Sequence, residues 1–294
     1  MQEKSLIANL KQQNIPLLPT DYGVIRITGT DATTFLQGQL TVDVGKLDSN
    51  RLTLAAHCNN KGRIVSLFYL HQAQANIFFL IMPNEILASA QDKLNKYVLF
   101  SKVEIHNVSS QYQVSGIVGS AAVSLATSGW EHESSTCLAR IGETTCFLLL
   151  QPHDKRLVTT GEATTWQAAL IANGIPTLLS QTQESFTPHD INLPALKAVD
   201  FNKGCYIGQE IIARMQFRGT PKKHLYRAQC VAAPTLTPGD QLITAQQQHY
   251  GNVVNVITQG TQQSLLLVIQ EALLNEAIFT TDRRPLSLSE IQRT

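Results

Sequence analysis

The sequence predicts an α+β protein made of mixed, mainly antiparallel sheets, with a small antiparallel β domain at its C-terminal end. Three observations favour this class. Strand-like and helical segments follow one another without the regular alternation of a parallel α/β protein. Residues 59–62, Asn-Asn-Lys-Gly, join two apolar runs as a hairpin turn. After the turn at 218–221, short strand-like runs separated by turn residues replace the helical patterns.

Residues 23–97 are predicted to hold four strands and two helices. The strand over 23–28 precedes Thr30 and Asp31, either of which is suited to cap a helix. That helix carries Phe35, Leu36 and Leu40. The apolar runs 51–58, 63–70 and 77–82 predict strands, the first two being the arms of the hairpin. Pro83 and Asn84 open a second helix, with apolar residues at helical spacing at Ile86, Leu87, Ala90, Leu94 and Tyr97.

Residues 102–294 are predicted to change from mixed to all-β structure. Helix 162–172 ends near Gly174, with Pro176 two residues later. Helix 209–216 has Ile211, Ile212 and Met215 on one stripe. Strands are predicted at 102–108, 112–118, 145–151, 226–233, 241–245, 251–258, 264–270 and 278–281. The last five indicate a small antiparallel barrel or sandwich, so we expect one region over 1–217 and a second domain over 218–294.

Composition excludes several classes of protein. The 294 residues, 43% hydrophobic and 15% charged, are typical of an ordinary globular protein of about two domains. No apolar run approaches the roughly 20 residues that cross a bilayer, and residues 1–4 do not resemble the start of a signal peptide. Five cysteines without a C-x-x-C pair favour a reducing compartment, so we expect a cytoplasmic protein. Eight scattered histidines give no ligand spacing, and no metal site is predicted.

The net charge of +1 hides a basic segment. Residues 197–227 contain seven bases and two acids, whereas residues 228–294 contain five acids and three bases. This excess could attract an anionic ligand or partner, or it could be a solvated helix and linker. The segment lacks the interleaved aromatic residues of a recognisable RNA-binding module, so direct nucleic-acid binding is not predicted.

The most specific motif is the octapeptide Lys203-Gly204-Cys205-Tyr206-Ile207-Gly208-Gln209-Glu210. The glycines allow a tight, exposed turn around Cys205. Lys203 and the predicted helix start both favour the thiolate over a free thiol of pKa about 8.5. The alternative is that Cys205 is a small buried hydrophobic residue. A relay of Cys205 with His189 and Asp190 is conceivable, but a turn in which Asp190 caps the backbone is favoured.

Together with four shorter runs, this motif resembles the YgfZ family, folate-binding relatives of the glycine-cleavage T-protein. The motif is followed by Ala213-Arg214 and Phe217-Arg218-Gly219 as in that family. The other runs occur in the family's order: Phe35-Leu36-Gln37-Gly38-Gln39-Leu40, Leu54-Ala55-Ala56-His57-Cys58 with Lys61-Gly62, Phe100-Ser101-Lys102-Val103 and Asn192-Leu193-Pro194-Ala195-Leu196. The tail after about residue 220 resembles the family only in its strand pattern.

The resemblance implies a T-protein-like folate-binding fold of two α+β lobes, with the terminal domain a β-barrel. It implies a tetrahydrofolate-linked role in supporting iron–sulfur enzymes, including those that thiolate transfer RNA. The folate contacts of the family correspond to Tyr22, where tryptophan is usual, and to Trp166. The motif carries over as Lys203, Gly204, Cys205, Tyr206, Gly208, Gln209 and Glu210. Within it we expect Cys205 to be the reactive thiol and Lys203 to favour its thiolate. The basic residues Arg214, Arg218, Lys222 and Lys223 are candidates for folate's glutamate tail or for a partner surface.

Two departures from the T-protein pattern bear on activity. T-proteins place paired acidic residues where this chain has Ser66-Leu67. Without a carboxylate, positive charge developing on a folate nitrogen would not be stabilised, so aminomethyl transfer is not expected. T-proteins and some YgfZ members also have a glutamate where this chain has Ala172-Asn173-Gly174, so that Asn173 or another residue would have to compensate in folate binding.

Three functions are therefore considered. The leading hypothesis is a folate-binding accessory protein in iron–sulfur cluster assembly or repair, with cluster assembly factors or cluster-dependent enzymes as partners. The second is a tetrahydrofolate-dependent aminomethyl or methyl transferase, against which Ser66-Leu67 argues. The third is a non-catalytic scaffold that docks through the basic patch.

Overall fold

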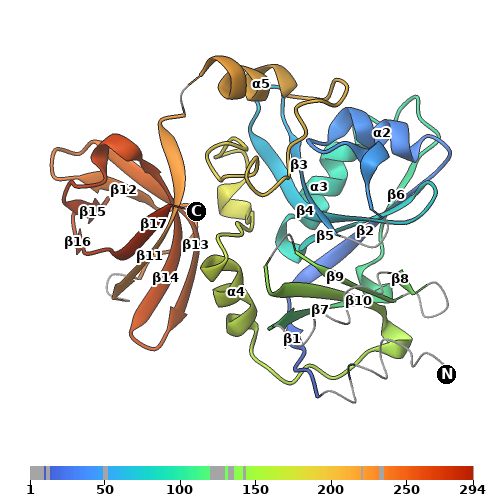
Figure 1. Ribbon diagram of the computed structural model, residues 1–294, viewed down its shortest axis with the longest axis horizontal. Helices are drawn as coiled ribbons and strands as arrows, with labels where there is room; N and C mark the ends of the chain where they lie inside the picture. The colour runs from blue at the N-terminus through green and yellow to red at the C-terminus, as the bar shows by residue number, and fades with distance from the viewer. Residues whose placement is uncertain are drawn as a thin grey trace. The chain divides into compact units, whose positions relative to one another are not determined.

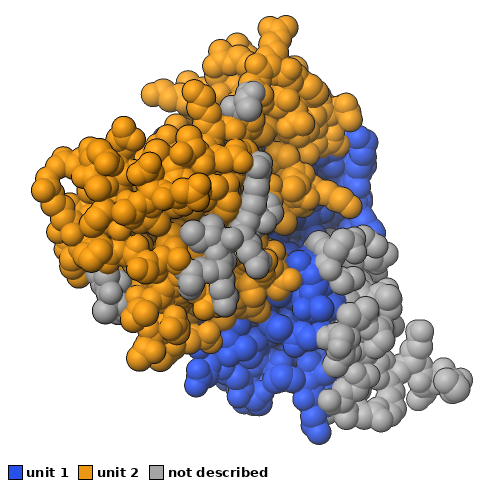
Figure 2. Space-filling view, turned by 60° about the vertical axis from the view of Figure 1, so that its left-hand side comes forward, with its two compact units in different colours: residues 1–55, 68–166 blue, residues 56–67, 167–294 orange. Residues whose placement is uncertain are grey.

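The computed structural model describes residues 10, 14–48, 52–119, 130–131, 136–141, 144–219, 221–231 and 235–293. The chain divides into two compact units, residues 1–55 with 68–166 and residues 56–67 with 167–294 (Figure 2). The predicted boundary between residues 217 and 218 stays a prediction. Predictions that touched residues 1–4, 51, 220 and 232–233 fall outside the described residues.

The first unit contains most of a five-stranded antiparallel sheet. Its order is β3 (Thr53–Cys58), β4 (Ile64–Gln74), β5 (Ile77–Pro83), β2 (Tyr22–Thr28) and β6 (Glu104–Asn107) (Figure 1). The adjoining ends of β3 and β4, with the turn between them, belong to the second unit. The sequence predicted all five strands, because each alternates or runs apolar between clear turn residues.

Two helices accompany this sheet in the sequence. In α3 (Asn84–Asn95) the residues Ile86, Leu87, Ala90 and Leu94 are buried, as their spacing predicted. A Cβ at Gly23 of β2 would lie 2.4 Å from Leu87, so the glycine lets α3 approach the strand closely. In α2 (Ala32–Gln39) Asp31 is at the N-cap, but its carboxylate accepts from the Lys102 backbone N at 2.8 Å and makes no cap bond.

The prediction that Tyr97 continues the apolar stripe of α3 was wrong. Tyr97 and Val98 donate their backbone N–H groups to Leu94 and Asn95, three residues back, so the chain leaves the helix in turns. Tyr97 is 47% exposed as a result.

A second sheet of the first unit has the order β1 (Leu18–Pro19), β7 (Tyr112–Val118), β10 (Cys146–Pro152), β9 (Thr136–Arg140) and β8 (Trp130–Glu131). The sequence predicted β7 and β10 but not the short strands β1 and β8, nor β9. The rings of Phe79 on β5 and Tyr112 on β7 meet edge to face with centres 5.2 Å apart, so the two sheets of this unit are in contact there.

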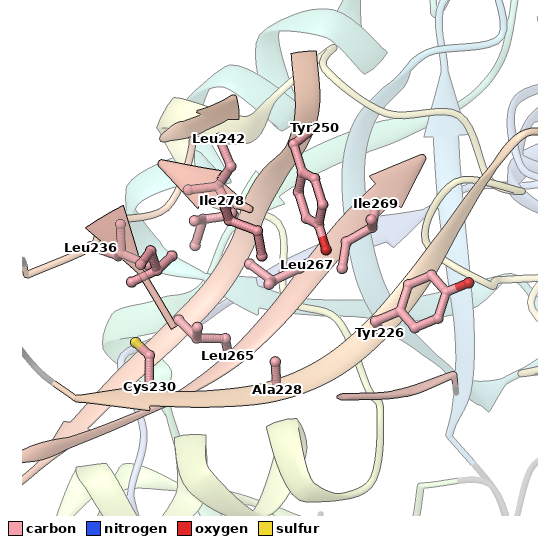
Figure 3. Packing of buried hydrophobic residues seen from close by; sticks show 12 residues of the cluster. Tyr226, Ala228, Cys230, Leu236, Leu242, Tyr250, Leu265, Leu267, Ile269 and Ile278 are labelled. Atoms are coloured by element: carbon pink, nitrogen blue, oxygen red, sulfur yellow. The ribbon is translucent and has the colours of Figure 1, made fainter. Parts of the chain in front are cut away.

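The C-terminal part of the second unit is one curled antiparallel sheet, a half-barrel (Figure 1). Its order is β16 (Pro285–Leu286), β15 (Ile278–Thr280), β12 (Gln241–Thr244), β13 (His249–Gln259), β14 (Gln262–Gln270), β11 (Lys223–Val231) and β17 (Ser289–Arg293). Alternate residues of these strands, among them Tyr250, Leu265, Leu267 and Ile269, fill its core (Figure 3). The predicted antiparallel tail is confirmed, and β16 and β17 extend it.

The remaining elements are helical or irregular. Helix α4 (Ala163–Ala172) crosses from the first unit to the second, and α5 (Gln209–Arg218) lies in the second. Short 3₁₀ helices occur at Val44–Lys46, Ser109–Gln111, His153–Lys155, Ser180–Thr182 and Glu271–Leu273. Residues 173–208 consist mostly of turns. They are tied to β13 by Asn255, whose side chain bonds both the N–H and the carbonyl of Thr177 at 2.8 Å. No helix in the described ranges is long and apolar enough to cross a membrane.

Candidate functional site

The octapeptide motif presents Cys205 to solvent. The turns at 201–208 lead directly into α5, and both Gly204 and Cys205 are exposed. Where the structure describes cysteine side chains, Cys58, Cys146 and Cys230 are buried. A Cβ at Gly204 would meet no atom within 4 Å, so the space beside the thiol is open. The motif thus exposes one sulfur atom that a reagent or partner can reach.

Gly208 fixes this loop against the β3–β4 hairpin. Its φ of +82° is in the left-handed region, which favours glycine. A Cβ there would lie 2.5 Å from the backbone oxygen of Asn59 and 3.3 Å from the Cβ of Cys58. On the hairpin side, Gly62 has a φ of +69° and lies against α5. A Cβ at Gly62 would lie 3.1 Å from the Cβ of Ile211. We call these two close approaches the hairpin contact.

Asn59 organises the turn of the hairpin that contacts the motif. The Asn59 side-chain oxygen accepts from the backbone N–H of Lys61 at 2.9 Å and of Arg63 at 3.0 Å. The Asn59 backbone oxygen accepts from Gly62 N at 2.9 Å. This Asx-type turn was predicted from the sequence as a hairpin. It leaves Lys61 exposed at the tip.

The irregular segment 184–190 holds the other side of the hairpin. Ile64 donates its N–H to the carbonyl of Phe186 at 2.9 Å and accepts from Glu184 N at 2.8 Å. The Arg63 guanidinium donates to the Ser185 carbonyl at 2.6 Å and lies 3.8 Å from the Asp190 carboxylate. Residues 184–190 therefore lie along the hairpin and satisfy backbone hydrogen bonds of its second strand.

Asp190 and His189 have structural partners. The Asp190 carboxylate accepts from the backbone N–H of Thr187 at 2.8 Å, as the favoured turn interpretation predicts. His189 Nε2 lies 3.1 Å from the Gln216 side-chain oxygen. Burial lowers the pKa of His189, which favours the neutral ring. These bonds engage the Asp190 carboxylate and His189 Nε2, while His189 Nδ1 is buried without a partner among the described residues. A relay with Cys205 stays a hypothesis.

Beneath the exposed thiol the motif is buried. The Lys203 ammonium lies 4.9 Å from the centre of the Tyr206 ring, and both residues are less than a tenth exposed. Such a cation–π contact helps to offset the desolvation of a buried lysine. Burial, more than the neighbouring Cys58 and Asp200, raises the pKa of Tyr206. The proposed activation of Cys205 by Lys203 stays a prediction.

Cys58, the second cysteine near the motif, is buried and is not expected to react as a nucleophile. Its side chain is 1% exposed, and burial raises the pKa of its thiol to about 12. It is therefore protonated at neutral pH and unreactive as a nucleophile. Only Cys205, of this pair, combines exposure with an open approach.

The helix start contributes less to Cys205 than the sequence suggested. Helix α5 begins at Gln209 with Gly208 as its N-cap. Cys205 precedes that cap by three residues, and the influence of a helix dipole falls off within about one turn. Glu210 in the first turn and Arg218 in the last both complement the dipole.

The two residues assigned to folate by resemblance lie in the first unit. Tyr22 is half-buried at the start of β2 and stacks on Tyr69, with ring centres 6.2 Å apart. Burial, and then contact with Tyr22, raises the pKa of Tyr69 well above its usual value. Tyr69 was not singled out in the sequence, where it is one apolar residue in a long strand.

Trp166 is buried against a glycine of β7. It is 2% exposed, and a Cβ at Gly116 would lie 2.4 Å from its indole ring. A glycine inside a strand commonly marks such a close approach, which is the sequence signal that could have revealed it. Among the described residues, Trp166 Nε1 has no hydrogen-bond partner although it is buried. A ligand acceptor at this position would satisfy that nitrogen.

Ser66 and Leu67 are both buried on β4. The Ser66 hydroxyl has no hydrogen-bond partner in the described part of the chain. This place therefore offers neither a carboxylate nor an exposed polar group for one-carbon chemistry.

Asn173, considered as a replacement for the missing glutamate, is engaged in ending its own helix. Its side-chain nitrogen donates to the Ala169 carbonyl at 2.8 Å, and Gly174 follows with φ +66°. The Arg227 guanidinium donates to the Ala172 carbonyl at the same helix end. The described residues contain no group of three or more histidine, cysteine or acidic side chains suited to a metal ion.

Comparison with known proteins identifies relatives and a fold. Residues 20–137 match the model of the GCVT N-terminal domain family. An uncharacterised protein of Haemophilus influenzae is 37% identical over 70% of both chains. The tRNA-modifying protein YgfZ of Hamiltonella defensa is 31% identical over 91% of this chain and 86% of its own, and that of Colwellia psychrerythraea is 30% identical over 70% and 69%.

Among solved structures, the chain is similar to the glycine cleavage system aminomethyltransferase T from Bartonella henselae. The TM-score is 0.71 over 96% of this chain and 88% of that one, at 16% sequence identity. At this identity the likeness establishes the fold. The predicted T-protein-like α+β fold is confirmed.

Proposed function

Because the chain belongs to the family of tRNA-modifying YgfZ proteins, we propose that it is a folate-binding accessory protein for cluster-dependent enzymes that thiolate transfer RNA. Its role would be iron–sulfur cluster assembly or repair. The observation that carries the proposal is the exposed Cys205, held by Gly208 on the hairpin while the thiol of Cys58 stays buried. A protein that only bound folate would not need an exposed thiol on a rigid support.

The proposed ligand is tetrahydrofolate or a derivative, which carries one-carbon units and reducing equivalents. Trp166 Nε1 is the donor that fits such a ligand, since it is buried and has no partner in the described structure. With its ring 2% exposed, Trp166 offers little area for stacking, so the half-buried Tyr22 is proposed as the stacking residue. Arg218 is exposed at the end of α5, and its assignment to the glutamate tail stays a prediction from the sequence.

The proposed chemistry belongs to the thiol rather than to one-carbon transfer. A thiolate at Cys205 can attack a disulfide sulfur or ligate an iron ion or cluster as substrate. Lys203 is proposed to favour that thiolate as a positive charge close in sequence. An aminomethyl transferase is disfavoured, because Ser66 and Leu67 supply no carboxylate.

Calorimetric titration of the full chain with tetrahydrofolate tests the ligand. We expect saturable heat with one site per chain. Replacing Trp166 by phenylalanine keeps the ring packing on Gly116 but removes Nε1, and it should weaken binding about ten-fold, the usual cost of one hydrogen bond in a buried site. The matched control is Trp130, the other tryptophan of the chain, changed to phenylalanine.

Absence of heat with the wild-type chain would exclude the folate part of the proposal. It would favour the third hypothesis, a scaffold that docks through the basic patch. Equal affinities of wild type and Trp166→Phe would instead remove Trp166 from the site.

A further inference from the structure

The outer face of α5 carries an exposed aromatic ring between two arginines. Phe217 is 69% exposed, although Ile212 on the opposite side of the same helix is fully buried. Arg214 and Arg218, one turn before and one residue after Phe217, are also exposed. We call Arg214, Phe217 and Arg218 the α5 face. The α5 face therefore offers an apolar ring for contact directly beside two positive charges.

The α5 face is connected to the cysteine loop by packed rings. Phe217 meets Phe201 edge to face, with ring centres 5.8 Å apart. Phe201 in turn lies 6.0 Å from the His189 ring, which bonds Gln216 of α5. Phe201 is four residues before Cys205 on the same loop. A partner that covers Phe217 is therefore held beside the loop that carries the exposed thiol.

The charges of the α5 face are available to a partner. Within the described ranges neither Arg214 nor Arg218 forms an ion pair. Lys222 is exposed shortly after the helix, whereas Glu210 is the acidic residue of α5 itself. Guanidinium groups pair most strongly with carboxylates and phosphates.

We propose, on the basis of the proposed function, that the α5 face docks into an acidic groove with an apolar pocket on the cluster-dependent tRNA-thiolating enzyme. Docking would bring Cys205 to that enzyme. Phenylalanine and arginine together are typical of the energetically dominant residues of protein interfaces. A helix presents such an anchor outward into a groove of its partner. The open space at Gly204 leaves the neighbouring thiol accessible to the docked surface.

Single-stranded RNA is the other occupant with matching chemistry, because bases stack on aromatic rings and phosphates bind arginine. The folded chain places aromatic rings beside the basic residues, which the sequence did not reveal. The protein partner is favoured because non-specific RNA sites run along a basic groove with successive stacking rings. Here one ring is exposed, on the convex face of a helix, and Phe201 beneath it is half-buried.

The test measures the dissociation constant between the full chain and the purified, cluster-loaded tRNA-thiolating enzyme of the same organism. The test variant is Phe217→Ala with Arg214→Glu, which leaves Arg218, assigned to folate, unchanged. We expect binding at least about thirty-fold weaker than wild type, as for a central interface anchor. The matched control is Val231→Ala with Lys96→Glu, an apolar residue 57% exposed and an exposed lysine elsewhere, which should bind like wild type.

Additional variants and measurements distinguish failure of docking from failure of the thiol hypothesis. Cys205→Ala should bind the enzyme like wild type, so failure of the thiol hypothesis does not imitate failure of docking. The unfolding midpoint of the test variant should stay close to that of wild type, because both changed side chains are exposed. Undetectable binding by wild type, or equal binding by wild type and the test variant, overturns the proposal. Loss of affinity for an unmodified tRNA transcript, with affinity for the enzyme retained, overturns it in favour of an RNA surface.

Discussion

Replacing Cys205 by alanine is expected to lower the thiolated nucleosides of cellular tRNA to the level of a strain that lacks the gene. The expectation follows from the exposure of the Cys205 side chain. Cys205 is the sulfur that the hairpin contact presents to solvent, whereas Cys58 beside it is buried with a pKa of about 12 and cannot take over. Cys205→Ser should fail in the same way, because a serine hydroxyl is neither a comparable nucleophile nor a ligand for iron.

The control for this prediction is Asn202→Ala, a change at an exposed position of the same loop. It should keep wild-type levels of thiolated nucleosides. Unfolding midpoints of all three variants should equal that of wild type, because exposed side chains contribute little to stability. Wild-type nucleoside levels in the Cys205→Ala strain would remove the proposed role of the thiol.

Replacing Gly208 by alanine is expected to destabilise the protein by about 2–5 kcal/mol. A left-handed backbone costs a non-glycine residue about 1–2 kcal/mol, and forcing an extra carbon into a packed contact costs about 1–3 kcal/mol. Both terms apply, because φ is +82° and the new Cβ would lie 2.5 Å from the Asn59 backbone oxygen. Relief of that clash requires the loop to move away from the hairpin.

Gly204→Ala is the matched control within the same motif. Its added carbon enters open space, and its φ is not in the left-handed region. The stability should change by less than about 1 kcal/mol, and a gain is possible because alanine restricts the unfolded chain. Denaturant unfolding of both variants measures the difference. Equal unfolding free energies for Gly208→Ala and Gly204→Ala would mean that the hairpin contact does not hold the motif.

Local elements of the fold were predictable where a short segment determines its own conformation. The hairpin is an example, since Asn59 and Gly62 specify the turn and the flanking apolar runs specify the strands. Helix α5 is another, as Ile212 is buried where the stripe predicted it. The two-residue strand β16 was missed because its pairing with β15 depends on the curled sheet rather than on its own residues.

The exposed turn around Cys205 was predictable from the sequence, but the contacts that support this turn were not. Cys205, Gly204 and Gly208 could be singled out from the sequence of the motif alone. It did not reveal that Gly208 meets Asn59, about 150 residues earlier, because contacts at that separation leave no local pattern. The packing of Phe201 on Phe217 was missed for the same reason, although both lie near the motif. Tyr69 and Gly116 were missed because each is an ordinary strand residue until its neighbour is known.

The most direct test is the rate at which the native, full-length protein reacts with Ellman's reagent, an aromatic disulfide that detects accessible thiolates. The account predicts a fast-reacting thiol that is present in wild type and disappears in Cys205→Ala. A fast phase that persists in Cys205→Ala, or a wild-type protein whose thiols react only after unfolding, would contradict the claim that this chain presents Cys205 as its reactive group.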